Sequence, residues 1–163
     1  MKKVLITLVA VLICAGTVAF AATDTKTVTV SATVTATAKL TLGSATLTFP
    51  DADPDTTPSI SATEGPIAIT AKGKTSAAGN ITLVVKAGGP LTSGTDTIAL
   101  ANLTWTAGGA GYVGGTMNIA DQAVGSWTGS GTYAGTQTYA LANSWSYVTG
   151  NYGATLTYTL TAP

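Results

Sequence analysis

Apolar and polar residues alternate without a break from Thr25 to Leu42. An alternation with a period of two residues is typical of a β-strand with one buried and one solvent-exposed face. At about 3.3 Å per residue this segment would extend roughly 60 Å, about three times the length of an ordinary strand. No glycine or proline interrupts it before Gly43, so it has no favourable position at which to turn. We therefore expect that it either crosses both sheets of its own domain or projects and is buried by another molecule.

Shorter alternating segments follow along the rest of the chain. They are residues 45–49, 66–71, 81–87, 97–106, 112–119, 122–127, 136–141 and 152–160. Glycine or proline separates most of them, and the loop 50–58 contains three prolines and three aspartates. Eight or nine short strands separated by such turn signals predict an all-β fold, an immunoglobulin-like antiparallel β-sandwich.

The first 21 residues have the pattern of a signal peptide, which we expect to be helical. Lys2 and Lys3 precede the apolar stretch 4–13, and Ala19-Phe20-Ala21 matches a small-x-small cleavage site. The apolar stretch is too short for a retained membrane helix, so we expect no membrane segment after cleavage. The sequence predicts a signal peptide over 1–21, a long alternating strand over 22–42 and a sandwich domain over 43–163. Such a chain would be a bacterial protein that is secreted or held at the cell surface.

The composition of the predicted mature chain narrows its partners. It has no histidine and no arginine, and the one cysteine, Cys14, lies within the signal. A lipid-modified cysteine normally follows a small residue, whereas Ile13 stands here, which favours removal of Cys14 with the signal over a lipid anchor. Five lysines face seven acidic residues, a balance of −2, which argues against nucleic acid or an anionic membrane as partner. Threonine makes up about a fifth of the chain, and a weakly charged β-surface of this kind suits dense packing in an assembly.

Few groups are available for catalysis. Without histidine or cysteine, the mature chain lacks a Ser–His or Cys–His nucleophile pair and has no imidazole or thiolate metal ligand. Two carboxylates suffice for glycoside hydrolysis, so composition does not exclude that reaction. Three of the seven acids crowd one proline-rich loop, however, and the others stand alone. We expect a non-enzymatic protein with no catalytic residue and no cofactor.

The acidic residues Asp51, Asp53 and Asp55 have a D-x-D-x-D spacing, and their oxygens are candidate ligands for Ca²⁺. The calcium loop of helix–loop–helix proteins has glycine at its sixth position and glutamate at its twelfth, where this chain has Thr56 and Ala62. The alternative is a solvated acidic loop that discourages a sheet edge from pairing with other chains.

All tryptophans and tyrosines lie after residue 104. Trp145 and Tyr147 would share one face if their segment were extended, and two aligned rings can stack on a sugar. These two residues are therefore the candidates for glycan contacts. Packing in the core or at its rim is the alternative for them and for the other aromatic residues.

The C-terminal segment resembles that of the chaperone–usher pilins and of the related spore coat protein U family. In those subunits a glycine fourteen residues from the end precedes alternating apolar residues. Here Gly150 precedes Tyr152, Ala154, Leu156, Tyr158 and Leu160. The chain differs in having Ala162 where those pilins have a penultimate tyrosine, and it lacks their disulfide. The resemblance implies that a periplasmic chaperone grips this strand and that residues 25–42 form an extension donated to the next subunit.

The last residues are also similar to the end of the WxL cell-wall-binding domain. The similarity covers residues 155–160 followed by Ala162-Pro163, with Tyr158 where that domain has tryptophan. It implies a contact with the cell wall.

Together these patterns predict a secreted structural subunit of a surface layer or fibre, which assembles by β-strand addition. The partner would be a second copy or another surface subunit. The predicted assembly face consists of Val28, Val30, Ala32, Val34, Ala36 and Ala38. The alternative is a module that binds cell-wall or extracellular polysaccharide through exposed aromatic residues.

Overall fold

The computed structural model describes residues 22–163, so the predicted signal peptide over 1–21 lies outside the described residues. The chain divides into two units, one ending at Thr33 and the other beginning at Val34. In the first unit, residues 22–33 form neither helix nor strand, and their side chains are exposed. The second unit contains every strand of the described chain.

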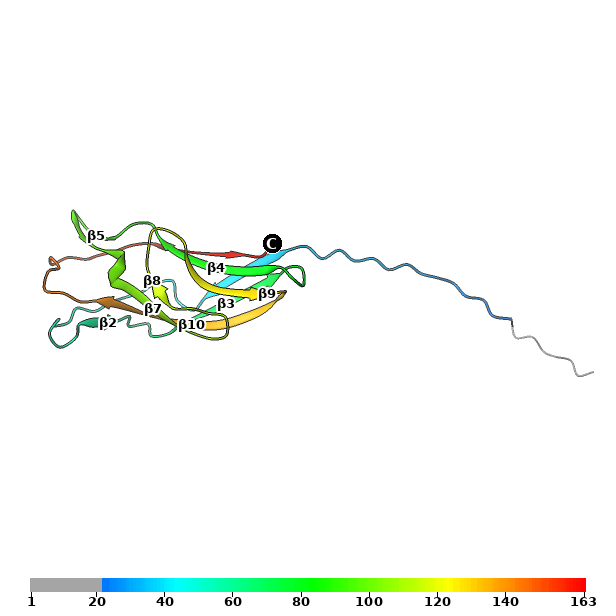
Figure 1. The fold of residues 1–163 in the computed structure, drawn as a ribbon, viewed down its shortest axis with the longest axis horizontal. Helices are drawn as coiled ribbons and strands as arrows, with labels where there is room; N and C mark the ends of the chain where they lie inside the picture. The colour runs from blue at the N-terminus through cyan, green and yellow to red at the C-terminus, as the bar shows by residue number, and fades with distance from the viewer. Residues whose placement is uncertain (1–21) are drawn as a thin grey trace, which may run out of the picture. The chain divides into compact units, whose positions relative to one another are not determined.

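Six antiparallel strands form the larger sheet of the second unit (Figure 1). Five of them follow the spatial order β1 (Thr37–Leu42), β3 (Ile67–Lys74), β10 (Gly131–Ala142), β7 (Leu103–Gly108) and β8 (Gly115–Thr116). The sixth strand, β2 (Ser59–Ser61), pairs with the end of β10. Because β10 pairs first with β3 and later with β2, it runs the whole length of this sheet.

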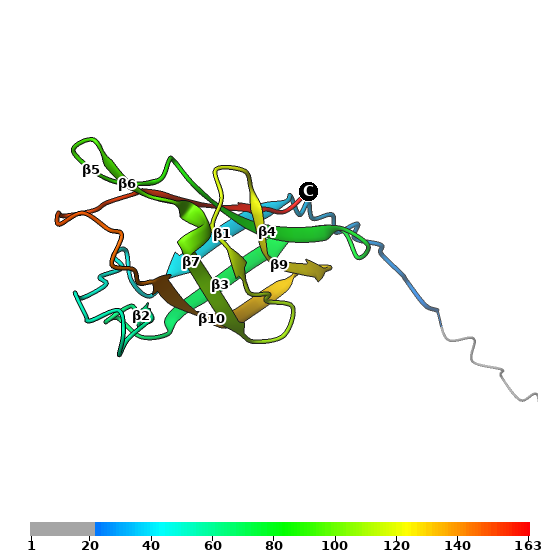
Figure 2. The same ribbon diagram turned by 60° about the vertical axis from the view of Figure 1, so that its left-hand side comes forward.

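Three antiparallel strands form the smaller sheet, which lies against the larger one (Figure 2). Their spatial order is β11 (Leu156–Thr161), β4 (Asn80–Ala87) and β9 (Gln122–Thr128). A short hairpin of β5 (Leu91–Ser93) and β6 (Asp96–Ile98), followed by the 3-10 helix η1 (Leu100–Asn102), connects β4 to β7.

The core lies between the two sheets because apolar side chains alternate along their central strands. On β4, Leu83 and Val85 are completely buried, and on the larger sheet Ile69 and Tyr139 are buried to the same degree. These residues belong to one continuous core cluster with contributions from both sheets. The predicted all-β antiparallel sandwich is therefore confirmed.

The described residues contain eleven strands rather than eight or nine. The strands β2 and β5 were not predicted, because three residues each are too few to display a period in the sequence. The predicted strand 97–106 is divided into β6 and β7 by η1, and only the two residues of β8 form a strand within the predicted 112–119. The predicted strand over 45–49 is absent, because residues 43–58 have irregular backbone. Their alternation still has a structural basis, since Leu47 and Phe49 are half-buried against the core.

Only the last six residues of the predicted 22–42 strand pair with another strand. β1 aligns with β3 from Thr37 opposite Lys74 to Leu42 opposite Ile69, and it ends just before Gly43. Residues 22–36 pair with no strand of the described chain. Within residues 22–163 there is no helix with the length and apolar character needed to cross a membrane.

Candidate functional site

The last strand, β11, forms one edge of the smaller sheet. It pairs with β4 through all six of its residues, and no strand among residues 22–163 pairs with its other edge. Its inward-facing side chains Leu156, Tyr158 and Leu160 are only half-buried, although they contact the core. One side of the sandwich therefore leaves a backbone edge and a row of apolar side chains partly uncovered.

The segment 42–49 forms the facing wall of this open side. Gly43 donates its amide to Ala68 O at 2.7 Å, and Thr48 accepts a bond from the Thr63 amide at 2.9 Å. Between these two anchors the chain forms no strand. A groove of about 360 Å³ lies between this wall and β11, and Leu42, Leu47, Leu156 and Tyr158 line it.

Glu64 fixes the wall of the groove at Thr48. The Thr48 amide donates to one carboxylate oxygen at 2.9 Å, and the Thr48 hydroxyl donates to the other at 2.8 Å. These two bonds stabilise the ionised carboxylate, and they hold the pKa of Glu64 below its ordinary value. Sequence reasoning did not single out Glu64, because its partner lies 16 residues away in an irregular segment.

A buried polar cluster connects β11 to the opposite sheet. The hydroxyl of Tyr158 donates to Gln137 Oε1, and the hydroxyls of Tyr158 and Tyr139 form a hydrogen bond with each other. Gln137 is completely buried, and its Nε2 has no hydrogen-bond partner within the described part of the chain. Burial raises the pKa of both tyrosines, so both hydroxyls stay protonated. This cluster positions Tyr158, and with it β11, beside the groove.

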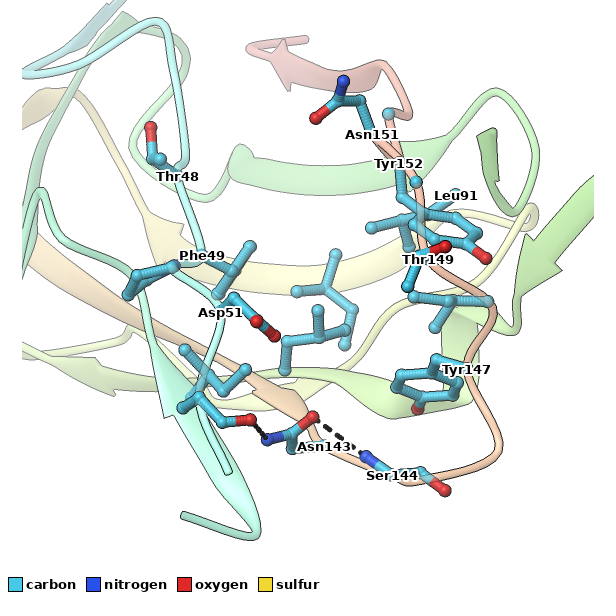
Figure 3. Close-up of a pocket in the computed structure, with 18 of the residues that line it drawn as sticks. Thr48, Phe49, Asp51, Leu91, Asn143, Ser144, Tyr147, Thr149, Asn151 and Tyr152 are labelled. Carbon is cyan, nitrogen blue, oxygen red and sulfur yellow. Dashed lines mark hydrogen bonds between the residues drawn. The ribbon is translucent and has the colours of Figure 1, made fainter. Parts of the chain in front are cut away.

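A larger cleft of about 850 Å³ lies next to the groove (Figure 3). Leu47, Ala154 and Leu156 line both hollows, so the two are adjacent. The cleft also reaches the core residues Ile60, Leu91, Ile98, Leu103 and Leu141. These five residues stay buried at the floor of the cleft, and its accessible walls are the loops around them.

Two loops, 47–54 and 143–154, form the sides of the cleft (Figure 3). Asn143 connects them by donating its side-chain amide to Ala52 O at 2.9 Å and to Thr57 O at 3.1 Å. Trp145 adds a bond from its indole nitrogen to Asp55 Oδ1 at 3.0 Å. The cleft is therefore built by two loops that are tied together.

The candidate calcium ligands Asp51, Asp53 and Asp55 lie exposed on the first of these loops. Asp53 Oδ1 accepts the amide of Asp55 at 2.9 Å, and Asp55 Oδ1 accepts the indole N–H of Trp145. Among residues 22–163, no three histidine, cysteine or acidic side chains converge in a group that could hold a metal ion. Two of the three aspartates thus act as acceptors that shape the loop.

The candidate glycan residues Trp145 and Tyr147 lie in a turn, where Tyr147 donates its amide to Ser144 O at 3.2 Å. The extended segment that would place both rings on one face is not present. Trp145 is 71% exposed at the rim of the cleft. Tyr147 is half-buried in the cleft wall, and its hydroxyl donates to Ala142 O at 3.0 Å.

The predicted assembly face lies almost entirely in the segment without strand pairing. Val28, Val30 and Val34 are 83%, 87% and 76% exposed. Ala32 and Ala36 are exposed as well, whereas Ala38 belongs to β1 and aligns with Gly73 of β3. We call the unpaired alternating segment, residues 25–36, the ribbon. The chain therefore has both a ribbon without a strand partner and a groove beside the free edge of β11.

The sequence matches no protein-family model, and a search of curated proteins finds no match. The resemblances to pilins and to the WxL domain remain predictions.

Proposed function

We propose that this protein is a non-enzymatic secreted subunit of a surface fibre, in which residues 25–36 of one copy enter the groove beside β11 of the next. The main support for this proposal is that β11 has a free edge beside an apolar groove, and that the same chain contains an alternating segment without a strand partner. Strand addition satisfies both features, because the added strand supplies backbone hydrogen bonds and covers the exposed row of side chains.

The ribbon and the C-terminal segment have the same number of alternating apolar positions. The unpaired segment has five alternating apolar positions, Val28, Val30, Ala32, Val34 and Ala36. The last strand and the residues before it also have five, Tyr152, Ala154, Leu156, Tyr158 and Leu160, of which Ala154, Leu156 and Tyr158 line the groove and Tyr152 lines the adjoining cleft. Each valine that becomes buried contributes about 1.5–3 kcal/mol, from which the cost of ordering the segment must be subtracted.

A second copy suits the groove better than the chain's own segment does. To enter its own groove, the chain would have to reverse direction between Val34 and Thr37, since β1 begins at Thr37. The sequence there is Val-Thr-Ala-Thr, without a glycine, proline, asparagine or aspartate to form the turn. Continued extension into a neighbouring molecule requires no such turn.

The direction of the added strand decides the form of the assembly. The ribbon is joined to the sandwich at Thr37, which we call the ribbon root and which aligns with Lys74. Thr75, the residue after Lys74, bonds Pro163 O. The ribbon root and the C-terminus therefore lie at the same end of the sandwich. An added strand antiparallel to β11 enters from the opposite end, with Val34 beside Ala154. Each copy then receives at one end and donates at the other, which gives an open chain of subunits.

A pair of single substitutions tests this proposal. Val30→Asp would place a charge in the apolar groove, so this variant of the mature protein should remain a folded monomer in sedimentation velocity. Thr29→Asp is the matched control, because it adds the same charge at the neighbouring position on the solvent side, and it should assemble like the wild type. Unchanged assembly of Val30→Asp, or a monomeric wild type at high concentration, would show that the mechanism is wrong.

A further inference from the structure

Three of the five lysines beyond residue 21 gather on one face of the larger sheet. Lys39 of β1 lies directly opposite Lys72 of β3, and Lys74 follows two residues later on the same face. We call these three exposed residues the basic patch. Like charges at directly opposed positions of a sheet are destabilising. The two ion pairs among residues 22–163, Lys26–Asp24 and Lys86–Asp121, involve none of them.

Three of the seven acidic residues gather at the other end of the sandwich, in the acidic loop of Asp51, Asp53 and Asp55. The distance between the basic patch and the acidic loop follows from the length of β10. Thr132, near the start of β10, aligns with Lys72, and Asn143, just beyond its end, bonds Ala52 O in the acidic loop. Eleven residues at about 3.3 Å each place the two groups about 36 Å apart along the strand. Figures 1 and 2 show the C-terminus, beside the end of β3, and the β2 region at opposite ends of this unit.

At this separation the two groups cannot neutralise each other within one molecule, since screening at physiological ionic strength acts over about 8 Å. We propose that the basic patch of one copy docks on the acidic loop of the next copy. This inference rests on the proposed function, because it names the contact between neighbours in the same assembly. Two equal and opposite groups at the two ends make the surface complementary to a second copy of itself.

The position of the ribbon brings the two groups together. Lys39 lies two residues after the ribbon root at Thr37, and Lys74 aligns with that root. Asp51 and Asp53 line the cleft at the end where an antiparallel ribbon enters. No spare residue separates Ala36, the last ribbon position, from β1, so the donating domain arrives with its basic patch against the acidic loop. A parallel ribbon would instead bring two basic patches together, which like-charge repulsion disfavours.

Charge reversal on the full mature protein tests the docking. Lys72→Glu should slow assembly at low salt by about tenfold or more, because docking charges mainly accelerate association. Lys86→Glu makes the same change of net charge on the smaller sheet and should assemble at the wild-type rate. The difference should vanish at about 1 M salt, where the screening length is about 3 Å. Equal rates for Lys72→Glu and Lys86→Glu at low salt would overturn the docking.

Three further variants test whether a charge change merely disrupts the fold and whether the two surfaces contact each other. The variant D51N D53N D55N keeps the acceptor oxygens of the loop and should slow assembly as Lys72→Glu does. A K39E K72E K74E variant and a D51K D53K D55K variant should each assemble poorly alone and co-assemble when mixed. If Val30→Asp blocks assembly but every charge variant behaves as wild type, strand addition stands and the docking fails. If Val30→Asp assembles normally while Lys72→Glu is slow, the docking stands and strand addition fails.

Discussion

Gln137 occupies a position at which the alternation along β10 calls for an apolar side chain. Its neighbours on the same face, Tyr139 and Leu141, are buried as the pattern requires, and Gln137 is completely buried with them. Its amide oxygen accepts a bond from the hydroxyl of Tyr158, which in turn accepts one from the hydroxyl of Tyr139. A single polar residue in the core thereby connects the edge strand β11 to the opposite sheet.

Glu64 likewise holds a wall of the groove in place, in this case the segment 42–49. Its carboxylate holds Thr48 through two hydrogen bonds, and these bonds favour the ionised form. Because the folded-state pKa lies below the ordinary value of 4.5, the contact stabilises the fold at higher pH. That stabilisation is lost as the pH falls through the folded-state pKa.

We therefore expect Glu64→Gln to change how stability depends on pH. Above the ordinary pKa of 4.5 the wild type should melt at a higher temperature than the variant, and the difference should shrink as the solution is acidified further. Melting temperatures measured for both proteins across this range test it. Thr48→Val, which removes only one of the two bonds, should show an intermediate difference. Parallel curves with a constant offset would contradict this role for Glu64.

At the scale of elements, alternation in the sequence predicted the strands that carry the core. β3, β4, β9 and β10 lie within or overlap the segments predicted from the period of two, since each has one face in the core. The same pattern led to a wrong prediction over 45–49. There the apolar side chains contact the core, but the backbone follows bonds to Ala68 and Glu64 instead of a strand.

The candidate groove could not be predicted from the sequence for a related reason. Its two walls, 42–49 and 154–158, are more than a hundred residues apart in the chain, and only the pairing of β11 with β4 alone exposes the edge between them. The alternation of the ribbon was visible in the sequence because it is local, although only Thr37–Leu42 of the predicted 22–42 strand form a strand. Sequence reasoning therefore identified the segment that the proposal inserts but not the surface that receives it.

Strand addition makes a prediction for hydrogen exchange in β11. In the assembled wild type the amides of residues 154–160 should exchange more slowly than in monomeric Val30→Asp, because the added strand covers the free edge. The amides of β4, at the centre of the smaller sheet, serve as the internal control and should exchange alike in both samples. Equal exchange of residues 154–160 in the two samples would mean that the free edge of β11 is not the site of assembly.

At the scale of the whole molecule, the proposed assembly is polar. The sandwich presents a ribbon root with a basic patch at one end and an open cleft with an acidic loop at the other. Such a unit adds to itself head to tail, and each addition buries one ribbon and leaves one groove free. Growth would then continue until a subunit without a ribbon, or a different protein, occupies the last groove.

Disulfide trapping between two single-cysteine variants tests the central claim most directly, because the predicted mature chain contains no cysteine of its own. One variant carries Val34→Cys in the ribbon and the other Ala154→Cys in the groove. The control pairs Val34→Cys with Thr132→Cys, an exposed position on the larger sheet away from the groove. Because each variant carries a single cysteine, a disulfide between the two variants in a mixture can form only between different molecules.

The account predicts that the Val34→Cys and Ala154→Cys proteins form a disulfide-linked heterodimer in high yield under mild oxidation, whereas the control pair does not. The contradicting result is a yield for the groove pair no higher than for the control pair. In that case the ribbon of one copy does not lie in the groove of another.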